Sequence, residues 1–101
     1  MTKENTYSIY IVECIDGTYY TGISTDLQRR IKEHNTNDRQ GAKYTKSRRP
    51  VHLVFSKSNI KNRKLASIGE YFIKKLTRNQ KKLIIDGDEE MVQLLKNRIY
   101  V

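Results

Sequence analysis

Four side chains in the first third of the chain have the types and spacing of a reactive site. They are Tyr10, Tyr20, Arg30 and His34. Phenol and imidazole groups exchange hydrogen bonds in both directions, and an arginine near a protein core must find an anion or another acceptor. The four groups can act together only if the stretch that carries them folds back on itself. The elements that would position them are therefore the first question.

The stretch begins as two short strands joined by a tight turn. β-Branched and aromatic residues predominate on both sides of Asp16-Gly17, which is a strong hairpin signal. A two-residue turn would place the rings of Tyr10 and Tyr20 on opposite faces of the sheet. A three-residue loop, with Gly17 in the left-handed conformation, would instead pair Tyr10 with Gly22. We predict the three-residue loop, because it puts both rings on one face.

A helix is expected to follow the hairpin, from about Thr25 to about Asn35, with Thr25 as its N-cap. At 100° per residue, Arg30 and His34 lie on or beside its apolar stripe, one helical turn apart. The helix would therefore hold these two polar groups at the boundary of the core.

The rest of the chain supplies one more strand and three helices. We expect the strand at 51–55 and the helices at about 59–76, 78–85 and 88–97. Alternation within the strand predicts Leu53 and Phe55 on the same face. Together these elements predict an α+β fold with a small three-stranded antiparallel sheet and helices packed on it. We expect one domain over 1–101, with its core at about 7–85.

Positive charge is concentrated in the middle of the chain. The formal net charge of +9 makes nucleic acid the expected partner, ahead of an acidic protein or an anionic membrane surface. Between Arg39 and Lys82 there are fourteen Lys or Arg residues and one acid, Glu70, whereas the remainder holds six bases and ten acids. Such a segment suits a surface that follows a phosphate backbone. The lone carboxylate within it requires an explanation.

The loop before the third strand is strongly basic and contains an aromatic residue. We expect its cations to contact phosphates and its tyrosine to stack a base. The residues are Lys43, Tyr44, Lys46, Arg48 and Arg49.

Cysteine content and hydropathy indicate the compartment. The single cysteine, Cys14, excludes an internal disulfide and cannot supply a multi-thiolate zinc site. No run approaches the roughly 18 apolar residues of a membrane span, and the N-terminal residues lack the apolar segment of a signal peptide. We therefore expect a cytoplasmic, reduced protein that does not contact a membrane, and we expect a monomer.

Each candidate also has an ordinary structural explanation. A strand tyrosine usually packs half-buried, and a histidine at a helix boundary is often only a structural group. Glu70 followed four residues later by Lys74 is a stabilising helical pair. Arg48 and Arg49 could be solvated loop residues, and Cys14 is most simply a small core residue. Taken singly, these explanations suffice, so a reactive site depends on the ordered set.

The ordered set resembles the motifs of the GIY-YIG endonuclease superfamily, whose two tripeptides lie on adjacent antiparallel strands. The matching residues are Ser8-Ile9-Tyr10, Tyr20-Thr21-Gly22, Arg30, His34 and Glu70. The chain looks most like the small single-domain bacterial members, which share blocks like the GAKYT at 41–45 and the RRPV at 48–51. Ser8 stands where the first motif usually has glycine. The resemblance spans roughly 7–85.

The resemblance implies a metal-dependent endonuclease that hydrolyses phosphodiester bonds in DNA, in repair or recombination. It implies Tyr10 as general base, Tyr20 as the second active-site tyrosine, Arg30 as the transition-state stabiliser, His34 as a supporting hydrogen-bonding group and Glu70 as the ligand of Mg²⁺ or Mn²⁺. Forming a phenolate at pH 7 from a pKa of about 10 costs about 4 kcal/mol, so Tyr10 would need a cation nearby.

Two other functions fit the same basic surface. One is a non-catalytic nucleic-acid-binding module, and the other is an adaptor that recognises an acidic protein. Neither needs a carboxylate among fourteen bases. The complete set of two tyrosines, arginine and glutamate therefore favours the enzyme.

Overall fold

The computed structural model describes residues 6–101, so most of the N-terminal segment on which the signal-peptide expectation rests lies outside the described residues. The elements, in chain order, are β1 Tyr7–Glu13, β2 Tyr19–Ser24, α1 Leu27–Thr36, α2 Lys43–Lys46, β3 His52–Ile60, α3 Arg63–Lys74, α4 Arg78–Ile85 and α5 Glu89–Ile99. Within 6–101, no helix is long and apolar enough to cross a membrane.

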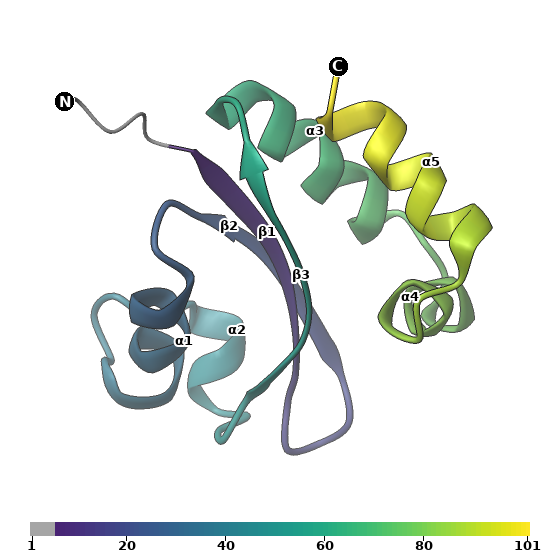
Figure 1. Ribbon diagram of the computed structural model, residues 1–101. Coiled ribbons are helices and arrows are strands. Elements are labelled where there is room, and N and C mark those ends of the chain that lie inside the picture. The colour runs from purple at the N-terminus through teal and green to yellow at the C-terminus, as the bar shows by residue number, and fades with distance from the viewer. Residues whose placement is uncertain (1–5) are drawn as a thin grey trace, which may run out of the picture.

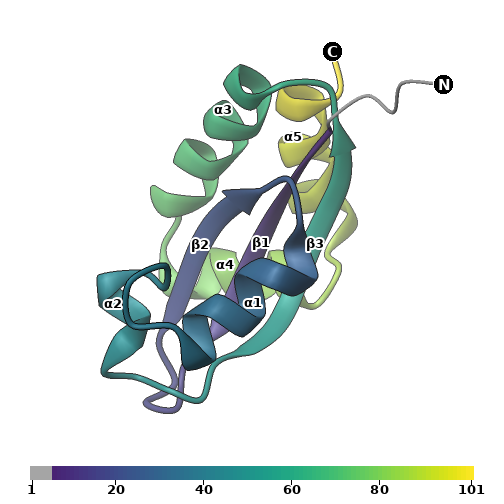
Figure 2. The same ribbon diagram turned by 90° about the vertical axis from the view of Figure 1, so that its left-hand side faces the viewer.

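The strands form one antiparallel sheet in the order β2-β1-β3. Helices α1 and α2 cover one face of this sheet, and α3, α4 and α5 cover the other (Figure 1). Turned by 90°, the molecule shows α1 crossing in front of the sheet (Figure 2). The predicted α+β fold with a three-stranded antiparallel sheet is confirmed.

The hairpin has the predicted three-residue register. Tyr10 pairs with Gly22 and Val12 pairs with Tyr20. Gly17 has a φ of 81°, the left-handed conformation that favours glycine at this point of the loop. Because side chains alternate along a strand, the rings of Tyr10 and Tyr20 share the face that α1 covers. The condition for a shared tyrosine site is therefore met.

Each face of the sheet has its own apolar core. On the face of α1, Tyr10 and Val12 pack with Cys14 and Val51. On the opposite face, Ile9 and Ile11 of β1 pack against α3 and α5, in a cluster of eight buried residues. Helix α3 approaches this face closely at Gly69, where a Cβ atom would lie 2.3 Å from Ile9 Cδ1. This contact fixes the height of α3 over the sheet.

The start of α1 differs from the prediction. Asp26, not Thr25, is the N-cap, and its Oδ1 accepts a hydrogen bond from the Arg29 backbone N–H at 3.1 Å. The Ser24 hydroxyl bonds both the N–H and the carbonyl of Asp26, at 3.0 and 2.9 Å. This turn at the end of β2 moves the helix start one residue along the chain.

Strand β3 is longer and less regular than predicted. It continues to Ile60, which pairs with Tyr7, so the residues near Asn59 are strand and α3 starts only at Arg63. A register shift in the pairing with β1 directs Leu53 towards α1 and Phe55 into the opposite core. The prediction that Leu53 and Phe55 share a face is wrong, because a bulge adds a residue to the alternation.

Candidate active site

A buried chain of hydrogen bonds runs from β1 through α1 to α2. Tyr10 is 1% exposed, and its hydroxyl lies 2.7 Å from His34 Nε2. His34 Nδ1 lies 2.9 Å from Thr45 Oγ1, and the Thr45 hydroxyl donates to the Ala42 carbonyl at 3.0 Å. The Ala42 backbone N–H also donates to His34 Nδ1, at 3.3 Å, when that nitrogen is unprotonated. The direction of the Tyr10–His34 hydrogen bond follows the His34 tautomer: with the proton on Nδ1, Nε2 accepts from the Tyr10 hydroxyl, and with the proton on Nε2, the Tyr10 oxygen accepts.

Gly22 makes room for the Tyr10 ring on the neighbouring strand. A Cβ atom at this position would lie 2.4 Å from the Tyr10 hydroxyl oxygen. Any larger residue would push the phenol away from His34, because Tyr10 and Gly22 are directly paired. The glycine of the second tripeptide thus has a steric role in placing the first tyrosine.

Burial sets the protonation of this chain. It raises the pKa of Tyr10 to about 12, and the neighbouring Arg30 guanidinium offsets only part of that rise. Burial, together with the positive charge of Arg30, lowers the pKa of His34 to about 4. Both groups are therefore neutral at pH 7. The cation that the sequence requires beside Tyr10 is present, but desolvation outweighs it.

Arg30 is held by its own helix and by the following loop. Its Nη1 contacts Glu33 Oε1 at 3.1 Å and donates to the Gln40 carbonyl. Glu33 also contacts Arg29 Nε at 3.5 Å, so one carboxylate serves two guanidinium groups. Within 6–101 no ion pair joins Arg30 to Glu70. Arg30 is thus fixed beside Tyr10 with part of its charge still uncompensated.

The Tyr20 ring packs against two other rings. Its ring lies edge-on to His34, with centroids 5.3 Å apart, and stacks on Tyr44 with centroids 5.8 Å apart. The Arg48 guanidinium covers the Tyr44 ring at 4.0 Å from its centroid. Tyr44 therefore supports Tyr20 in this arrangement, and stacking a base on its covered face would require Arg48 to move.

Glu70 reaches the same region from α3, on the other side of β2. Its side chain is 25% exposed and pairs with Lys74 Nζ at 3.5 Å. Lys74 Nζ lies 5.9 Å from the centroid of the Tyr20 ring. The Glu70 charge contributes to the raised pKa of Tyr10, after burial, so the carboxylate and the phenol share one electrostatic environment. The five residues of the ordered motif set are brought together.

One carboxylate is available for a metal ion. The described residues contain no group of three or more His, Cys, Asp or Glu that could hold one. Magnesium often uses one or two protein carboxylates and takes its other ligands from water and substrate phosphate. Glu70, half-buried and held only by a 3.5 Å contact to Lys74, fits a metal ion of that kind.

The basic loop divides into structural arginines and free lysines. Arg48 Nε contacts Asp16 Oδ2 at 3.1 Å, which ties the loop to the hairpin. Arg49 contacts Asp38 at 2.9 Å and donates from Nε to the His34 carbonyl at 2.6 Å. Lys43 and Lys46 are exposed, and neither has an ion-pair partner within 6–101. The lysines are the better placed for phosphate.

Two contributors to the site were missed by sequence reasoning. Thr45 is fully buried and orients His34, and only its place in the GAKYT block could have pointed to it. Glu33 holds both Arg29 and Arg30, and its spacing of three and four residues from Arg30 and Arg29 is the signal for the two ion pairs.

Paired tyrosines on a hairpin, an arginine and a histidine on the next helix, and a glutamate on a later helix are the motif set of a GIY-YIG catalytic domain. The chain belongs to the GIY-YIG catalytic domain family, whose profile matches residues 6–83. Among its relatives, the UPF0213 protein YazA of Bacillus subtilis is 46% identical over 84 residues, covering 83% of this chain and 82% of that protein.

Two further relatives show a similar match. The UPF0213 protein DP2720 of Desulfotalea psychrophila is 45% identical over 89 residues, covering 88% of this chain and 79% of that protein. The solution NMR structure of the UPF0213 protein BH0048 from Bacillus halodurans is 38% identical, with a TM-score of 0.52, and the match covers 86% of this chain and 93% of that one. The similarity thus extends over most of each protein.

Proposed function

We propose that the protein is a metal-dependent endonuclease that hydrolyses phosphodiester bonds in DNA. The supporting observation is the convergence of the Tyr10–His34 hydrogen bond, the Arg30 charge and the Glu70 carboxylate on one small region of a basic protein. A binding surface needs cations and stacking rings. It does not need a buried, hydrogen-bonded tyrosine–histidine pair within the electrostatic reach of a carboxylate.

Tyr10 is the group that accepts the proton of the attacking water. A full phenolate at pH 7, from a pKa of about 12, would cost about 7 kcal/mol. Burial keeps the pKa of His34 near 4, so at pH 7 its ring is neutral and has a free lone pair. A concerted relay through Tyr10 to His34 therefore avoids a free phenolate, because Tyr10 gives up its proton only as it takes the proton of the water.

In the relay, the water oxygen bonds to phosphorus while its proton moves to the Tyr10 oxygen. With the His34 proton on Nδ1, the Tyr10 proton passes at the same time to the free Nε2, 2.7 Å away. The bond from phosphorus to the leaving nucleoside oxygen breaks, and that oxygen takes a proton from solvent. Thr45 supports the step, because its oxygen accepts the Nδ1–H of the imidazolium that forms.

Arg30 and Tyr20 complete the work on the phosphate. Arg30 neutralises charge that develops on the non-bridging oxygens, a role for which its planar guanidinium is well suited. Tyr20, braced by His34 and Tyr44, positions the water or the phosphate through its hydroxyl. A Mg²⁺ or Mn²⁺ ion held by Glu70 would supply Lewis-acid stabilisation of the phosphate charge.

The basic loop is assigned to substrate binding because of its charge. Lys43 and Lys46 contact the substrate backbone, with Tyr44, Arg48 and Arg49 maintaining the shape of the loop between them. A DNA substrate in repair or recombination, a cytoplasmic location and a monomeric state are the setting that we propose for this activity.

The test is cleavage of labelled duplex, branched and single-stranded DNA, and of RNA, with Mg²⁺ or Mn²⁺. We expect metal-dependent products from the wild type and none from Glu70→Ala. Glu90→Ala, which removes an exposed carboxylate from α5, is the matched control and should cleave normally. Products that persist with Glu70→Ala would contradict the metal assignment.

A non-catalytic nucleic-acid-binding module is the second candidate. Two ion pairs favour this function. Glu33 pairs with Arg30, and Lys74 pairs with Glu70, so the arginine and the carboxylate that would act on a phosphate already have partners. Such a module predicts binding that weakens linearly in log salt and no cleavage with either metal. The same set of substrates, assayed for binding and cleavage side by side, separates the two functions.

A further inference from the structure

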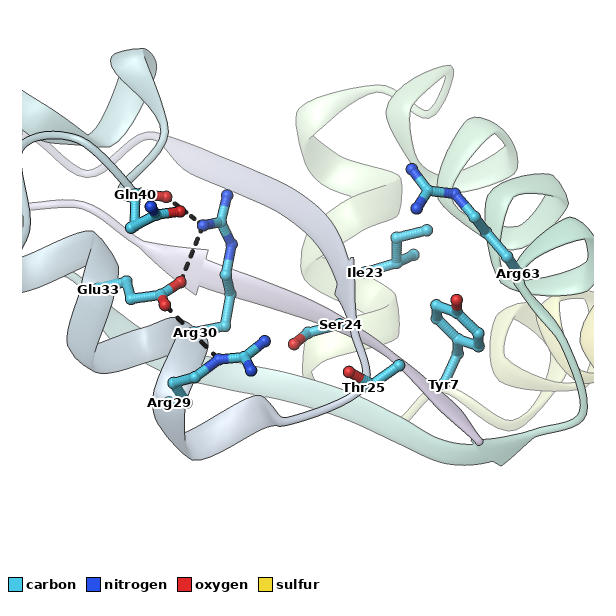
Figure 3. Close-up of a pocket in the computed structure, with 9 residues that line it drawn as sticks. All are labelled: Tyr7, Ile23, Ser24, Thr25, Arg29, Arg30, Glu33, Gln40 and Arg63. Atoms are coloured by element: carbon cyan, nitrogen blue, oxygen red, sulfur yellow. Dashed lines mark hydrogen bonds and ion pairs between the residues drawn. The ribbon is translucent and has the colours of Figure 1, made fainter. Parts of the chain in front are cut away.

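A polar cavity lies at the far end of β2, next to the catalytic residues but extending beyond them. Its volume is about 470 Å³, and it opens between α1 and the start of α3. Figure 3 shows Arg29, Arg30 and Glu33 on one side and Arg63 on the other, where Ile23 and Tyr7 lie next to Arg63. Residues from β1, β2, α1 and α3 thus meet around one space.

Several donors in this cavity bond no other described residue. The Arg63 side chain is exposed, and within 6–101 its guanidinium has neither an ion-pair partner nor a hydrogen-bond partner, so its five N–H groups are available to a ligand. The hydroxyls of Tyr7 and Thr25, which can donate or accept, also line the cavity and bond no described residue. A ligand with several acceptor oxygens matches this set.

The charge of the cavity points to an anion. Three guanidinium groups line it, from Arg29, Arg30 and Arg63, against one carboxylate, from Glu33. Glu33 is already shared between Arg29 and Arg30, which leaves Arg63 uncompensated. Guanidinium groups recognise phosphate oxygens in a planar, two-pronged geometry. A phosphate is therefore the anion that best matches this set.

The cavity is larger than a phosphate ion alone requires. Its 470 Å³ falls in the usual range of sites for small organic ligands, about 300–1,000 Å³. The Tyr7 ring and the Ile23 side chain add an apolar wall beside the donors (Figure 3). Such a space can take a phosphate together with its sugar or base.

The cavity also has a fixed relation to the proposed cleavage site. Arg63 and Glu70 are seven residues apart on α3, which places them on one face of the helix about 10 Å apart along its axis. At roughly 3.4 Å per stacked nucleotide, this span corresponds to about three steps of a strand, and to fewer if the strand is extended.

We propose that this cavity binds a second, internal phosphate of the nucleic-acid strand, a few nucleotides from the bond that is cleaved. Arg63 and Arg29 contact the phosphate oxygens, and Tyr7 contacts the sugar or base. The proposal rests on the proposed function for the identity of the strand as substrate. The cavity would be a binding site for the strand that does not depend on cleavage.

The first test measures oligonucleotide binding without metal, in the presence of a chelator, so that cleavage cannot contribute. We expect Arg63→Ala to weaken binding and to reduce the slope of log affinity against log salt by about 0.7–0.9, the loss of one phosphate contact. Lys64→Ala is the matched control, since it removes the adjacent exposed cation of the same helical turn. Equal slopes for the wild type and Arg63→Ala would overturn the proposal.

The second test identifies the source of the phosphate. Inorganic phosphate, titrated into ¹⁵N-labelled wild type, should shift the amide signals of Thr25 and Arg63, and an oligonucleotide with no terminal phosphate should shift the same signals. If only inorganic phosphate or a terminal phosphate does so, the cavity does not hold an internal phosphate and the proposal fails. If the wild type never cleaves but Arg63→Ala still lowers the salt slope, the endonuclease proposal fails and this one stands.

Discussion

The two sides of strand β2 hold their candidate catalytic groups in different ways. On the side of α1 and α2, Tyr10, His34 and Thr45 are each at most 1% exposed and are joined by hydrogen bonds of 2.7 and 2.9 Å. On the side of α3, the Glu70 side chain is 25% exposed, with one 3.5 Å contact to Lys74. One side is built into the core, whereas the other is held loosely at the surface.

This difference separates two kinds of preparation for catalysis. A proton relay works only when its donors and acceptors are already aligned, so the entropy cost of ordering these side chains is part of the folding free energy. A metal that takes ligands from water and substrate needs an accessible carboxylate instead. Substitutions on the first side should therefore alter both stability and activity, and substitutions on the second should alter activity alone.

The largest effect is expected from Tyr10→Phe. It removes the group that we propose as proton acceptor for the attacking water, so we expect cleavage to fall by about 10²- to 10⁴-fold. It also leaves His34 Nε2 buried without its hydrogen-bond partner, which should destabilise the fold by about 1–3 kcal/mol. Cleavage rates and urea unfolding of the same preparation measure the two effects.

Tyr71→Phe is the control for this change. Tyr71 lies on α3, is 61% exposed and is not part of the buried hydrogen-bond chain. This variant should leave the cleavage rate and the free energy of unfolding near wild type. Cleavage by Tyr10→Phe at the wild-type rate would exclude Tyr10 from the relay.

Acid sensitivity should distinguish the two histidines. The pKa of His34 falls from 6.5 to about 4 on folding, chiefly through burial, so the unfolded chain binds the proton more tightly. The stability due to neutral His34 is complete above pH 6.5 and is lost as the pH falls towards 4, by about 3 kcal/mol in total. Urea unfolding at a series of pH values measures this loss.

The matched pair is His34→Gln and His52→Gln, since His52 is exposed on β3. The difference in unfolding free energy between pH 6.5 and pH 4 should shrink in His34→Gln and persist in His52→Gln. A wild-type pH dependence in both variants would mean that His34 is not held neutral by burial.

Thr45→Val tests the outer end of the buried chain. Valine has nearly the shape of threonine but cannot accept the His34 Nδ1–H or donate to the Ala42 carbonyl. We expect a loss of about 1–3 kcal/mol in unfolding free energy and a smaller loss of cleavage than in Tyr10→Phe. Thr45→Ser keeps the hydroxyl, so it should restore most of the cleavage rate. Equal defects in both variants would indicate packing instead of His34 orientation.

The sequence predicts the parts of this arrangement that depend on local geometry. Asp16-Gly17 and the need for two rings on one face determine the hairpin register, and helix 78–85 is found with the predicted bounds. Strand β3 was predicted too short, because its extension to Ile60 depends on pairing with Tyr7, more than fifty residues away. Pairing over that distance leaves no local signal.

The same distinction applies to the site. Arg30 and His34 were found from helical spacing, which is local. The role of Thr45 depends on the basic loop folding back so that Thr45 meets His34, and the rise in the pKa of Tyr10 depends on the burial that results. The sequence indicates that a nearby cation would lower the pKa of Tyr10, and Arg30 does so. The sequence does not show how deeply Tyr10 is buried, and burial raises this pKa by more than Arg30 lowers it.

The smallest effect on stability is expected from Glu70→Gln. A helical ion pair four residues apart contributes about 0.2–0.5 kcal/mol, so losing the 3.5 Å contact to Lys74 should change the unfolding free energy by no more than that. Lys74→Gln removes the same pair from the other side and should cost an equal amount. If Glu70→Gln instead costs more than 1 kcal/mol, the carboxylate is part of the folded core, and the contrast between the two sides of β2 disappears.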